Sequence, residues 1–395
     1  MNSNSIIIVG ASAAGISAAR EIRSLDTEVP VRIFTDETYR PYYRPFLTEY
    51  IGDKSVENRV NFYLNPENWY RDRKIELNLG EKVVAVDPVG MSIQTEHGNR
   101  YSFSRLILAN GSRPFVPFKD AVGKKNVFSI RTLNDARAVH DQAEKAATAL
   151  VIGGGLLGLE AAHSLTNRGV EVTILEASDR ILPRQLDSEC SVILQNIVTR
   201  KNVTLIIGKS IDSITGDTMA KGVRLSTGEV VPADMIIISI GIRPNVDLAT
   251  NCGITVNWAV VVNDRMETTS SGIYACGDVA EFNGRNIALW MPAVNQGKVA
   301  GSNAAGKPAR FIDAVYPAVM NSFGTKIFSA GDLCLDMKEG DYKLHIMKNI
   351  DKNHYKKLFF VNDRLVGFIL IGDISESQKL TAAIKNGTAY ADLVP

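Results

Sequence analysis

Two glycine-rich segments carry the residue pattern of a dinucleotide-binding turn. Residues 10–15 (GASAAG) follow the apolar run 6–9, and residues 153–158 (GGGLLG) follow the apolar run 149–152. Glycine in such a turn lets backbone N–H groups and the N-terminus of the next helix approach a pyrophosphate. The first turn has Ser12 in place of the middle glycine, and serine is small enough to allow the same approach. Two such turns in one chain predict two bound dinucleotides.

An acidic residue follows the second strand of each unit. Asp36 and Glu37 come after 31–35, and Glu176 comes after 172–175. Glu176 lies near the spacing of roughly 20 residues at which a carboxylate accepts a hydrogen bond from the adenosine ribose. A carboxylate there repels a 2′-phosphate, so we expect NADH at this site, although Arg180 could accommodate the phosphate of NADPH. The economical pair is then a tightly but non-covalently bound FAD and NADH as co-substrate.

The elements around these turns alternate between strand and helix, which indicates an α/β fold. We expect helices at 16–25 and 159–167, further strands at 105–109, 235–240 and 273–275, and a helix from 290 to 305. After residue 316 the pattern changes to four expected strands, at 326–329, 342–347, 355–361 and 365–371, followed by a helix at 377–386. The sequence therefore predicts two nucleotide-binding units and an α+β appendage.

Composition excludes several other classes of protein. The 395 residues are 45% hydrophobic and 22% charged, and 44 basic against 43 acidic residues give a net charge of +1. This balance provides no overall basic field for nucleic acid, and no apolar run approaches the roughly 18 to 20 residues that cross a bilayer. The first residues lack the features of a signal peptide, so we expect a cytoplasmic protein. The cysteines and histidines show no metal-ligand spacing, and we expect no metal site.

Over essentially its whole length, the chain resembles the pyridine-nucleotide-linked FAD reductases, which share the plan of glutathione reductase. Besides the two turns, the likeness includes A-x-G at Ala109 and Gly111, G-x-x-P at Gly241 and Pro244, and YACGDVA at 274–280. It implies two Rossmann-like three-layer domains, an FAD-binding domain at 1–113 and 237–316 and an NAD-binding domain at 114–236. A C-terminal α+β domain at 317–395 would serve the acceptor or an interface. Cys276, within YACGDVA, is expected to be a small buried residue.

The resemblance also implies where each cofactor binds. Asp278 would hold the ribityl chain of FAD, and either Asp36 or Glu37 would hold the adenosine ribose. The helix that begins at Trp290 would point its positive end at the flavin. The expected FAD-binding residues are Gly10, Ser12, Ala13, Ala14, Gly15, Asp36, Glu37, Arg44, Pro45, Val83, Ala109, Gly111, Asp278, Trp290, Pro292 and Ala293. The expected NAD-binding residues are Gly153, Gly155, Leu156, Leu157, Gly158, Glu160, Glu176 and Gly241.

Residues 41–49 (PYYRPFLTE) resemble the electron-transfer branch of this superfamily, which includes rubredoxin, flavorubredoxin and ferredoxin reductases and the flavin modules of nitrite reductases. Disulfide reductases place a cysteine near 47–50, where this chain has none. Ferredoxin reductases have a lysine where Glu49 stands, and rubredoxin reductases have a glutamate. The resemblance places Glu160 beside the nicotinamide and the flavin. We expect Glu49 and Glu160 to be the catalytic residues and to converge, so that one of their pKa values rises.

The resulting hypothesis is an NADH:rubredoxin-type oxidoreductase, which takes a hydride from NADH onto FAD and passes single electrons to a small iron protein. Lysines that crowd together near the C-terminus could steer an acidic partner, or could form an ordinary solvated strand face. These are Lys343, Lys348, Lys352, Lys356 and Lys357. Two alternatives stay open: an NADH oxidase that reduces oxygen to peroxide, and a flavoprotein like apoptosis-inducing factor that changes conformation when it binds NADH.

Overall fold

The chain forms two compact units in the computed structural model, which describes residues 5–338, 340–349 and 354–394. The first unit contains the described residues of Met1–Phe46, Glu57–Arg113 and Ile242–Asp313. The second contains those of Leu47–Val56, Pro114–Gly241 and Ala314–Pro395. The boundaries of the three predicted functional domains stay a prediction. Within the described ranges, no helix is long and apolar enough to cross a membrane.

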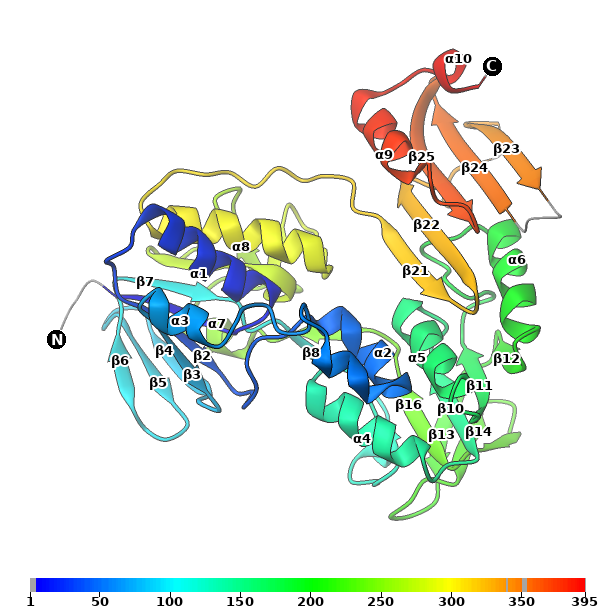
Figure 1. Ribbon diagram of the computed structural model, residues 1–395, viewed down its shortest axis with the longest axis horizontal. Coiled ribbons are helices and arrows are strands. Elements are labelled where there is room, and N and C mark those ends of the chain that lie inside the picture. The colour runs from blue at the N-terminus through cyan, green and yellow to red at the C-terminus, as the bar shows by residue number, and fades with distance from the viewer. Residues whose placement is uncertain (1–4, 339, 350–353, 395) are drawn as a thin grey trace. The chain divides into compact units, whose positions relative to one another are not determined.

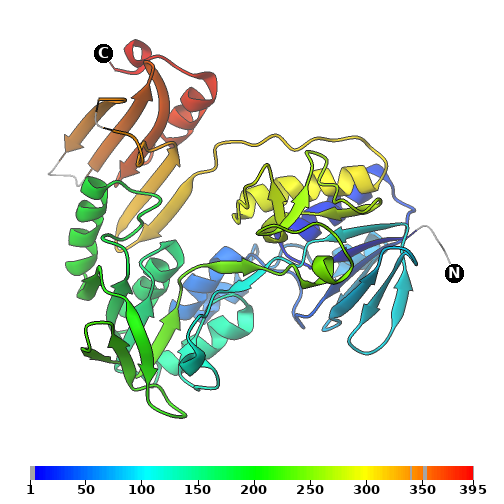
Figure 2. The same cartoon turned by 180° about the vertical axis from the view of Figure 1, so that it is seen from behind.

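A five-stranded parallel sheet, in the order β19-β7-β1-β2-β3, forms the centre of the first unit. All four residues of β1 (Ile6–Val9) are apolar and buried, as expected for a strand covered on both faces. Val9 pairs with Phe34 of β2 (Val31–Thr35) and with Leu108 of β7 (Arg105–Leu108), so these strands end at one edge. Figures 1 and 2 show α1 (Ala13–Leu25) and α8 (Trp290–Ala304) side by side over one face of this sheet.

Smaller elements complete the first unit. These are β3 (Ile75–Leu79), β19 (Ile273–Ala275), the antiparallel sheet of β4 (Val83–Asp87), β5 (Ser92–Thr95) and β6 (Arg100–Ser102), the pair β18 (Val260–Val262) and β20 (Ala280–Phe282), the short helices α3 (Asn68–Asp72) and α7 (Asp247–Asn251), and the 3-10 turns η1 (Arg44–Phe46) and η4 (Gly277–Val279). At the ends of the unit's segments lie η2 (Lys54–Asn58) and the paired strands β8 (Ser112–Pro114) and β17 (Ile242–Pro244).

The second unit repeats the parallel arrangement in a sheet ordered β12-β11-β10-β16-β9. Ile152 of β10 pairs with Leu175 of β11 and Ile238 of β16, and the antiparallel strands β13–β15 pack against this sheet through Val223 and Leu225. The elements are α2 (Leu47–Gly52), η3 (Lys119–Ala121), β9 (Val127–Phe128), α4 (Leu133–Ala143), β10 (Thr148–Ile152), α5 (Leu156–Thr166), β11 (Glu171–Glu176), α6 (Ser188–Thr199), β12 (Val203–Ile207), β13 (Ile211–Thr215), β14 (Gly222–Leu225), β15 (Val230–Pro232) and β16 (Met235–Ile238). Both parallel sheets confirm the predicted α/β fold.

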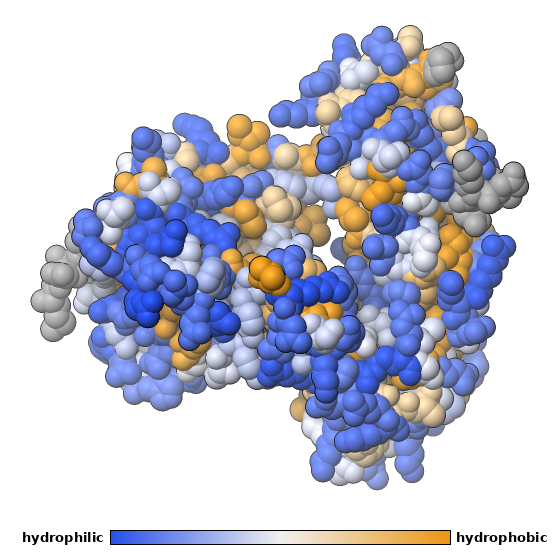
Figure 3. All heavy atoms as spheres, viewed as in Figure 1, coloured by the Kyte–Doolittle hydropathy of each residue, from blue (hydrophilic) through white to orange (hydrophobic). Residues whose placement is uncertain are grey.

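The C-terminal part of the second unit is an antiparallel sheet ordered β21-β22-β25-β24-β23, with α9 packed against it. Its core includes Phe360, Phe368 and Leu380. The elements are β21 (Ala318–Ser322), β22 (Thr325–Gly331), β23 (Lys343–Asn349), β24 (His354–Val361), β25 (Arg364–Ile371), α9 (Ser377–Asn386) and α10 (Tyr390–Leu393). Four of these strands and α9 were predicted, and β21 was missed. Hydrophilic side chains cover most of the surface seen in Figure 3.

Candidate functional site

The first glycine turn brings the N-terminus of α1 against the end of β7. Gly10 has a φ of +108°, and a Cβ atom on it would lie 2.1 Å from the carbonyl oxygen of Ala109, so the turn requires glycine. Ser12 occupies the N-cap position of α1, but its side chain bonds to no N–H group of the helix. The first helical residues, Ala13, Ala14 and Gly15, are buried. Helix N–H groups without a side-chain cap are those that bind an anion.

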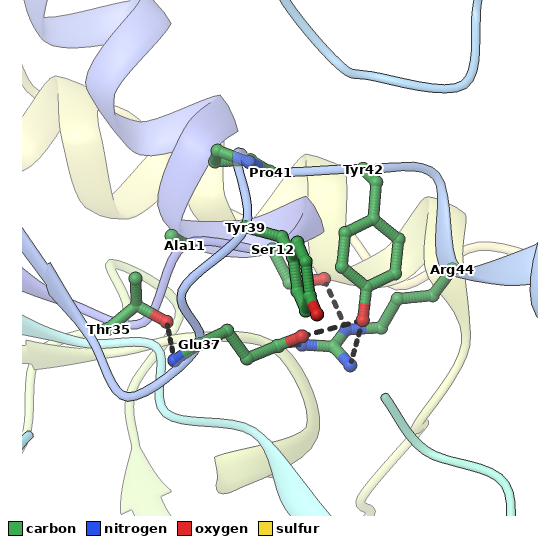
Figure 4. Close-up of a pocket in the computed structure, with 8 residues that line it drawn as sticks. All are labelled: Ala11, Ser12, Thr35, Glu37, Tyr39, Pro41, Tyr42 and Arg44. Atoms are coloured by element: carbon green, nitrogen blue, oxygen red, sulfur yellow. Dashed lines mark hydrogen bonds and ion pairs between the residues drawn. The ribbon is translucent and has the colours of Figure 1, made fainter. Parts of the chain in front are cut away.

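Arg44 closes a pocket beside this turn (Figure 4). Its Nε donates to Ser12 Oγ over 3.0 Å, and its Nη2 forms an ion pair with Glu37. The Tyr42 hydroxyl donates to Glu37 Oε2 over 2.6 Å. Burial opposes the charge of Arg44, but Tyr42 and Glu37 outweigh burial, and the pKa of the guanidinium is raised. Of the two candidate acids, Glu37 lies in this pocket, whereas Asp36 is exposed and is not among the described residues that line it.

Asp278 follows β19, whose end meets the ends of β7 and β1 at the same edge of the sheet. Its Oδ2 accepts a hydrogen bond from Ser112 Oγ over 2.8 Å, and its backbone carbonyl accepts one from Asn286 Nδ2 over 2.9 Å. Ala109 and Gly111 leave the neighbouring strand β7 at this edge. Cys276 lies between β19 and η4 and is fully buried. Burial raises the pKa of its thiol to about 12. The prediction of a buried Cys276 is confirmed.

The N-terminus of α8 belongs to the same unit. Trp290 begins this helix and packs edge-on against Tyr43, with ring centroids 4.7 Å apart. Leu289 at the N-cap position has no side chain that can bond to the helix, so the positive end of α8 has no side-chain cap. Pro292 and Ala293 are buried in its first turn. Tyr43 was not predicted as a site residue, although it lies within the segment 41–49 that the sequence singled out.

Of the predicted FAD residues, Ser12, Glu37 and Arg44 are among the described residues that line the pocket of Figure 4. Pro45 is exposed in η1, next to Arg44, and Val83 is buried at the start of β4. Neither is among the described residues that line the pocket. Their predicted contacts with FAD stay predictions.

The second glycine turn repeats the geometry of the first at the start of α5. Gly153 has a φ of +112°, and a Cβ atom on it would lie 2.2 Å from the carbonyl oxygen of Ser239. Glu176, at the end of β11, accepts hydrogen bonds from the backbone N–H of Gly154 over 2.7 Å and of Ser178 over 2.8 Å. Each carboxylate oxygen keeps a further lone pair for a hydroxyl group. The acid predicted to bind the ribose is therefore fixed against the turn.

The remaining residues of the predicted NAD site lie close to this turn in sequence or at a strand end. Gly155 is the N-cap residue of α5, and it leaves that helix without a side-chain cap. The first helical residues are Leu156, Leu157 and Gly158, of which Gly158 is buried and Leu157 is exposed. The carbonyl oxygen of Gly241 accepts from the backbone N–H of Phe115 over 2.9 Å. Arg180 donates to Asp179 and to the carbonyl oxygen of Pro183.

Glu160 joins α5 to α2. The Thr48 hydroxyl donates to Glu160 Oε2 over 3.0 Å, and Glu160 Oε1 has no hydrogen bond within the part of the chain that the structure describes. Burial raises the pKa of Glu160 to about 7, the Thr48 bond opposes this rise, and the nearby charge of Glu49 adds to it. The pKa of one of the two carboxyls rises, as predicted, and the charge of Glu49 contributes to the rise. Burial, rather than Glu49, is the larger cause.

Lys357 is not available for an exposed docking surface. Its side chain is 6% exposed and forms ion pairs with Asp187 over 2.5 Å and Glu189 over 3.1 Å. For this residue the prediction of a docking patch is wrong, because Lys357 faces the start of α6. The other described lysines of the group also have acidic partners: Lys343 pairs with Asp363, Lys348 with Glu189, and Lys356 with Glu376. Lys352 lies outside the described residues.

Two parallel sheets, each with a glycine turn before a helix that has no side-chain cap, form the arrangement expected of a protein that binds two dinucleotides. Residues 4–297 match the model of the pyridine nucleotide-disulphide oxidoreductase family, and residues 318–388 match that of the rubredoxin NAD+ reductase C-terminal domain. The chain belongs to the pyridine nucleotide-disulphide oxidoreductase family. Enzymes of this family are oxidoreductases that use FAD and NADH, which confirms the prediction of an oxidoreductase and of these two cofactors.

Relatives of this chain include larger proteins of nitrogen metabolism. It is 33% identical over 383 residues to the assimilatory nitrate reductase electron transfer subunit of Bacillus subtilis, covering 96% of this chain and 49% of the relative. It is also 33% identical over 390 residues to the nitrite reductase [NAD(P)H] of B. subtilis, covering 98% and 48%. The chain thus spans about half the length of these two relatives.

A relative of similar length is the NADH-rubredoxin oxidoreductase of Clostridium acetobutylicum, which is 28% identical over 397 residues and of which 97% is covered. The crystal structure of that enzyme matches the present fold with a TM-score of 0.81, covering 100% of this chain and 98% of the other. A second solved structure, the covalent putidaredoxin reductase-putidaredoxin complex, matches at 25% identity with a TM-score of 0.88, covering 98% and 94%.

Proposed function

We propose that this protein oxidises NADH through bound FAD and passes electrons one at a time to a small iron protein, either rubredoxin or a rubredoxin-like domain. The observation that carries the proposal is the Thr48–Glu160 hydrogen bond. It holds a carboxyl with a pKa of about 7 against α2, a helix whose residues include no cysteine. The Glu160 carboxyl can hold or release a proton when a hydride is transferred beside it. α2 supplies no thiol for disulfide exchange.

The chain offers binding groups for both dinucleotides. The uncapped N-termini of α1 and α5 favour pyrophosphates, and Glu37 and Glu176 offer acceptors for ribose hydroxyls. Arg44, held at the first turn by Ser12 and Glu37, offers charge-assisted donors. The uncapped positive end of α8 favours negative charge near Trp290. When bound, FAD supplies the chemistry that accepts a hydride and releases single electrons.

Glu160 is proposed to act beside the nicotinamide. Because its pKa is about 7, it is half protonated near neutrality and can hold or release a proton there. Thr48 fixes Oε2, which orients the carboxyl, while Oε1 is left for a group of the substrate. Glu49, exposed on the neighbouring helix, favours the protonated form of Glu160 through its charge. Glu49 is therefore proposed as a positioning residue that tunes Glu160.

The relatives support a small iron protein as the acceptor. The match to the rubredoxin NAD+ reductase C-terminal domain covers residues 318–388. The alignment with the NADH-rubredoxin oxidoreductase of C. acetobutylicum covers 100% of this chain and 97% of that relative. Of the predicted docking lysines, Lys343 and Lys348 keep side chains that are 67% and 50% exposed. We assign any electrostatic steering to these two residues of β23, and none to Lys357.

The proposal is tested by comparing rates of NADH oxidation with rubredoxin, with a two-iron ferredoxin and with oxygen alone. A rubredoxin rate far above the oxygen rate is expected. Equal rates with and without rubredoxin would instead establish an NADH oxidase. Prompt reduction of the flavin without turnover on any acceptor would establish a protein that responds to NADH by changing conformation. The Lys343→Gln and Lys348→Gln variants, with Lys145→Gln as an exposed control, test the steering at low ionic strength.

A further inference from the structure

A groove in the second unit lies between the end of α6 and the hairpin of β21 and β22. Figures 1 and 2 show this end of the hairpin beside α6. Arg200 and Lys201, which follow α6, line one side, and Thr325 and Lys326 at the start of β22 line another. No residue used so far for FAD, NADH or the acceptor lies in this groove, so it stands apart from the site described above.

The groove gathers three positively charged side chains. Arg200, Lys201 and Lys326 are exposed, and their side chains form no ion pair or hydrogen bond within residues 5–338, 340–349 and 354–394. None of its described lining residues is acidic. The lysines of the adjacent strands differ, since each one described has a carboxylate partner. Basic residues are favoured at the negative end of a helix, which explains in part why Arg200 and Lys201 follow α6. Lys326 belongs to the separate strand β22, so this effect does not explain its position.

The wall of the groove also contains a buried hydroxyl without a partner. Thr325 is 8% exposed, and its Oγ1 is buried and has no hydrogen-bond partner among the described residues. Buried polar atoms are almost always hydrogen bonded, so an isolated one calls for a missing partner. The hydroxyl is closed off from solvent, so a ligand in the groove would bond to it only after rotation of the Thr325 side chain. Such a rotation would add one hydroxyl donor to the three cations.

The geometry points to a binding site for a phosphate group, either inorganic phosphate or the phosphate of a small monoester. A doubly charged anion matches three uncompensated cations better than a single carboxylate does, and its oxygens can accept from guanidinium, ammonium and hydroxyl donors together. The binding site is separate from the pyrophosphate sites of the two glycine turns. It does not depend on the identity of the electron acceptor.

The back of the groove contacts the helix that carries Glu160. Phe323 lines the groove, its backbone N–H donates to His163 Nδ1 over 3.2 Å, and the two rings lie 4.9 Å apart. His163 is on α5, one turn after Glu160. Burial lowers the pKa of His163, and the charge of Lys201 lowers it further. A bound anion that neutralises Lys201 is expected to raise that pKa, which makes His163 a reporter of occupancy.

Binding is measured by titration calorimetry of the FAD-loaded protein at constant ionic strength, with inorganic phosphate, ribose 5-phosphate and ribose as probes. We expect both phosphates to bind and ribose not to bind. Stronger binding of ribose 5-phosphate would identify a monoester as the ligand, and equal binding would identify phosphate itself. NMR signals of the His163 ring should shift with either phosphate.

Three variants separate a built site from general attraction. Lys326→Gln is expected to weaken phosphate binding about tenfold, and Lys326→Arg to retain it. Thr325→Val should weaken binding while leaving the unfolding temperature unchanged or higher, because it removes an unpartnered buried hydroxyl. Lys145→Gln, an exposed lysine elsewhere in the unit, is the control. Equal losses in Lys145→Gln, or equal binding of acetate, would overturn the proposal. So would slower reduction of rubredoxin by Lys326→Gln without binding of any phosphate, which would mark a protein-docking surface.

Discussion

Replacing Glu160 with glutamine tests the carboxyl that carries the proposed function. Burial raises the pKa of Glu160 from an ordinary 4.5 to about 7. Between these values the folded protein holds a proton that the unfolded chain has released, so stability falls as the pH rises through this window and stays low above it. Since one pH unit corresponds to about 1.4 kcal/mol, the ionised carboxyl costs the folded protein about 3 kcal/mol above pH 7.

Glutamine has no charge to lose and still accepts a hydrogen bond from Thr48. Relative to the wild type, Glu160→Gln is therefore expected to gain up to about 3 kcal/mol in free energy of unfolding between pH 5 and pH 8. Urea unfolding at the two pH values measures this difference. Stopped-flow reduction of the flavin by NADH provides the second measurement, in which the wild type should show an inflection near pH 7 that the variant lacks.

Two further variants bracket this result. Glu49→Gln removes a charge that raises the pKa of Glu160, so its inflection should move to lower pH. Thr48→Val removes the hydrogen bond that opposes the rise, so its inflection should move to higher pH. Glu171→Gln, an exposed glutamate at the start of β11, should leave the profile unchanged. An inflection that stays near pH 7 in Glu160→Gln would refute the assignment of this titration to Glu160.

Three other changes have defined outcomes. Glu176→Ala removes the carboxylate that repels a 2′-phosphate, so the ratio of kcat/KM for NADPH to that for NADH should rise, and an unchanged ratio would exclude Glu176 from the ribose site. Gly10→Ala places a Cβ against Ala109 and should abolish FAD absorbance in the purified protein, whereas full flavin content would show that the turn can relax. Lys357→Met removes the buried ammonium that pairs with Asp187, while Glu189 keeps Lys348 and Tyr355, and it should lower the free energy of unfolding by about 2 to 3 kcal/mol, against less than about 1 kcal/mol for Lys343→Gln; similar losses in denaturant unfolding would contradict the difference in burial.

Structural features that depend on a short stretch of sequence were predicted correctly. Both glycine turns, the strands that precede them and the helices that follow were predicted because apolar runs of strand length end at glycines. The interaction of Glu49 with Glu160 came from the family resemblance, since the two lie on separate helices and no local pattern joins them. Its main physical cause, burial of Glu160, depends on packing that the sequence does not display.

The failures have a common origin in contacts between distant segments. Lys357 resembles its exposed neighbours in sequence, but pairing with Asp187 and Glu189 turns it inward. β21 was missed because its five residues, AVMNS, bury only Met320 and Ser322 and depend on pairing with β22. Thr48 was missed as a site residue because its partner is more than a hundred positions away. Only its place beside Glu49 offered a signal.

The link between β24 and α6 limits how this chain can exchange parts with its relatives. Lys357 and Tyr355 belong to the segment that matches the C-terminal domain, but the carboxylates they bind belong to a helix of the preceding domain. A chimera that takes residues 318–388 from another protein inherits new side chains opposite Asp187 and Glu189. A chimera of this kind keeps the buried ion pair only when the donor has a cation at the position of Lys357, or when α6 is transferred with the segment.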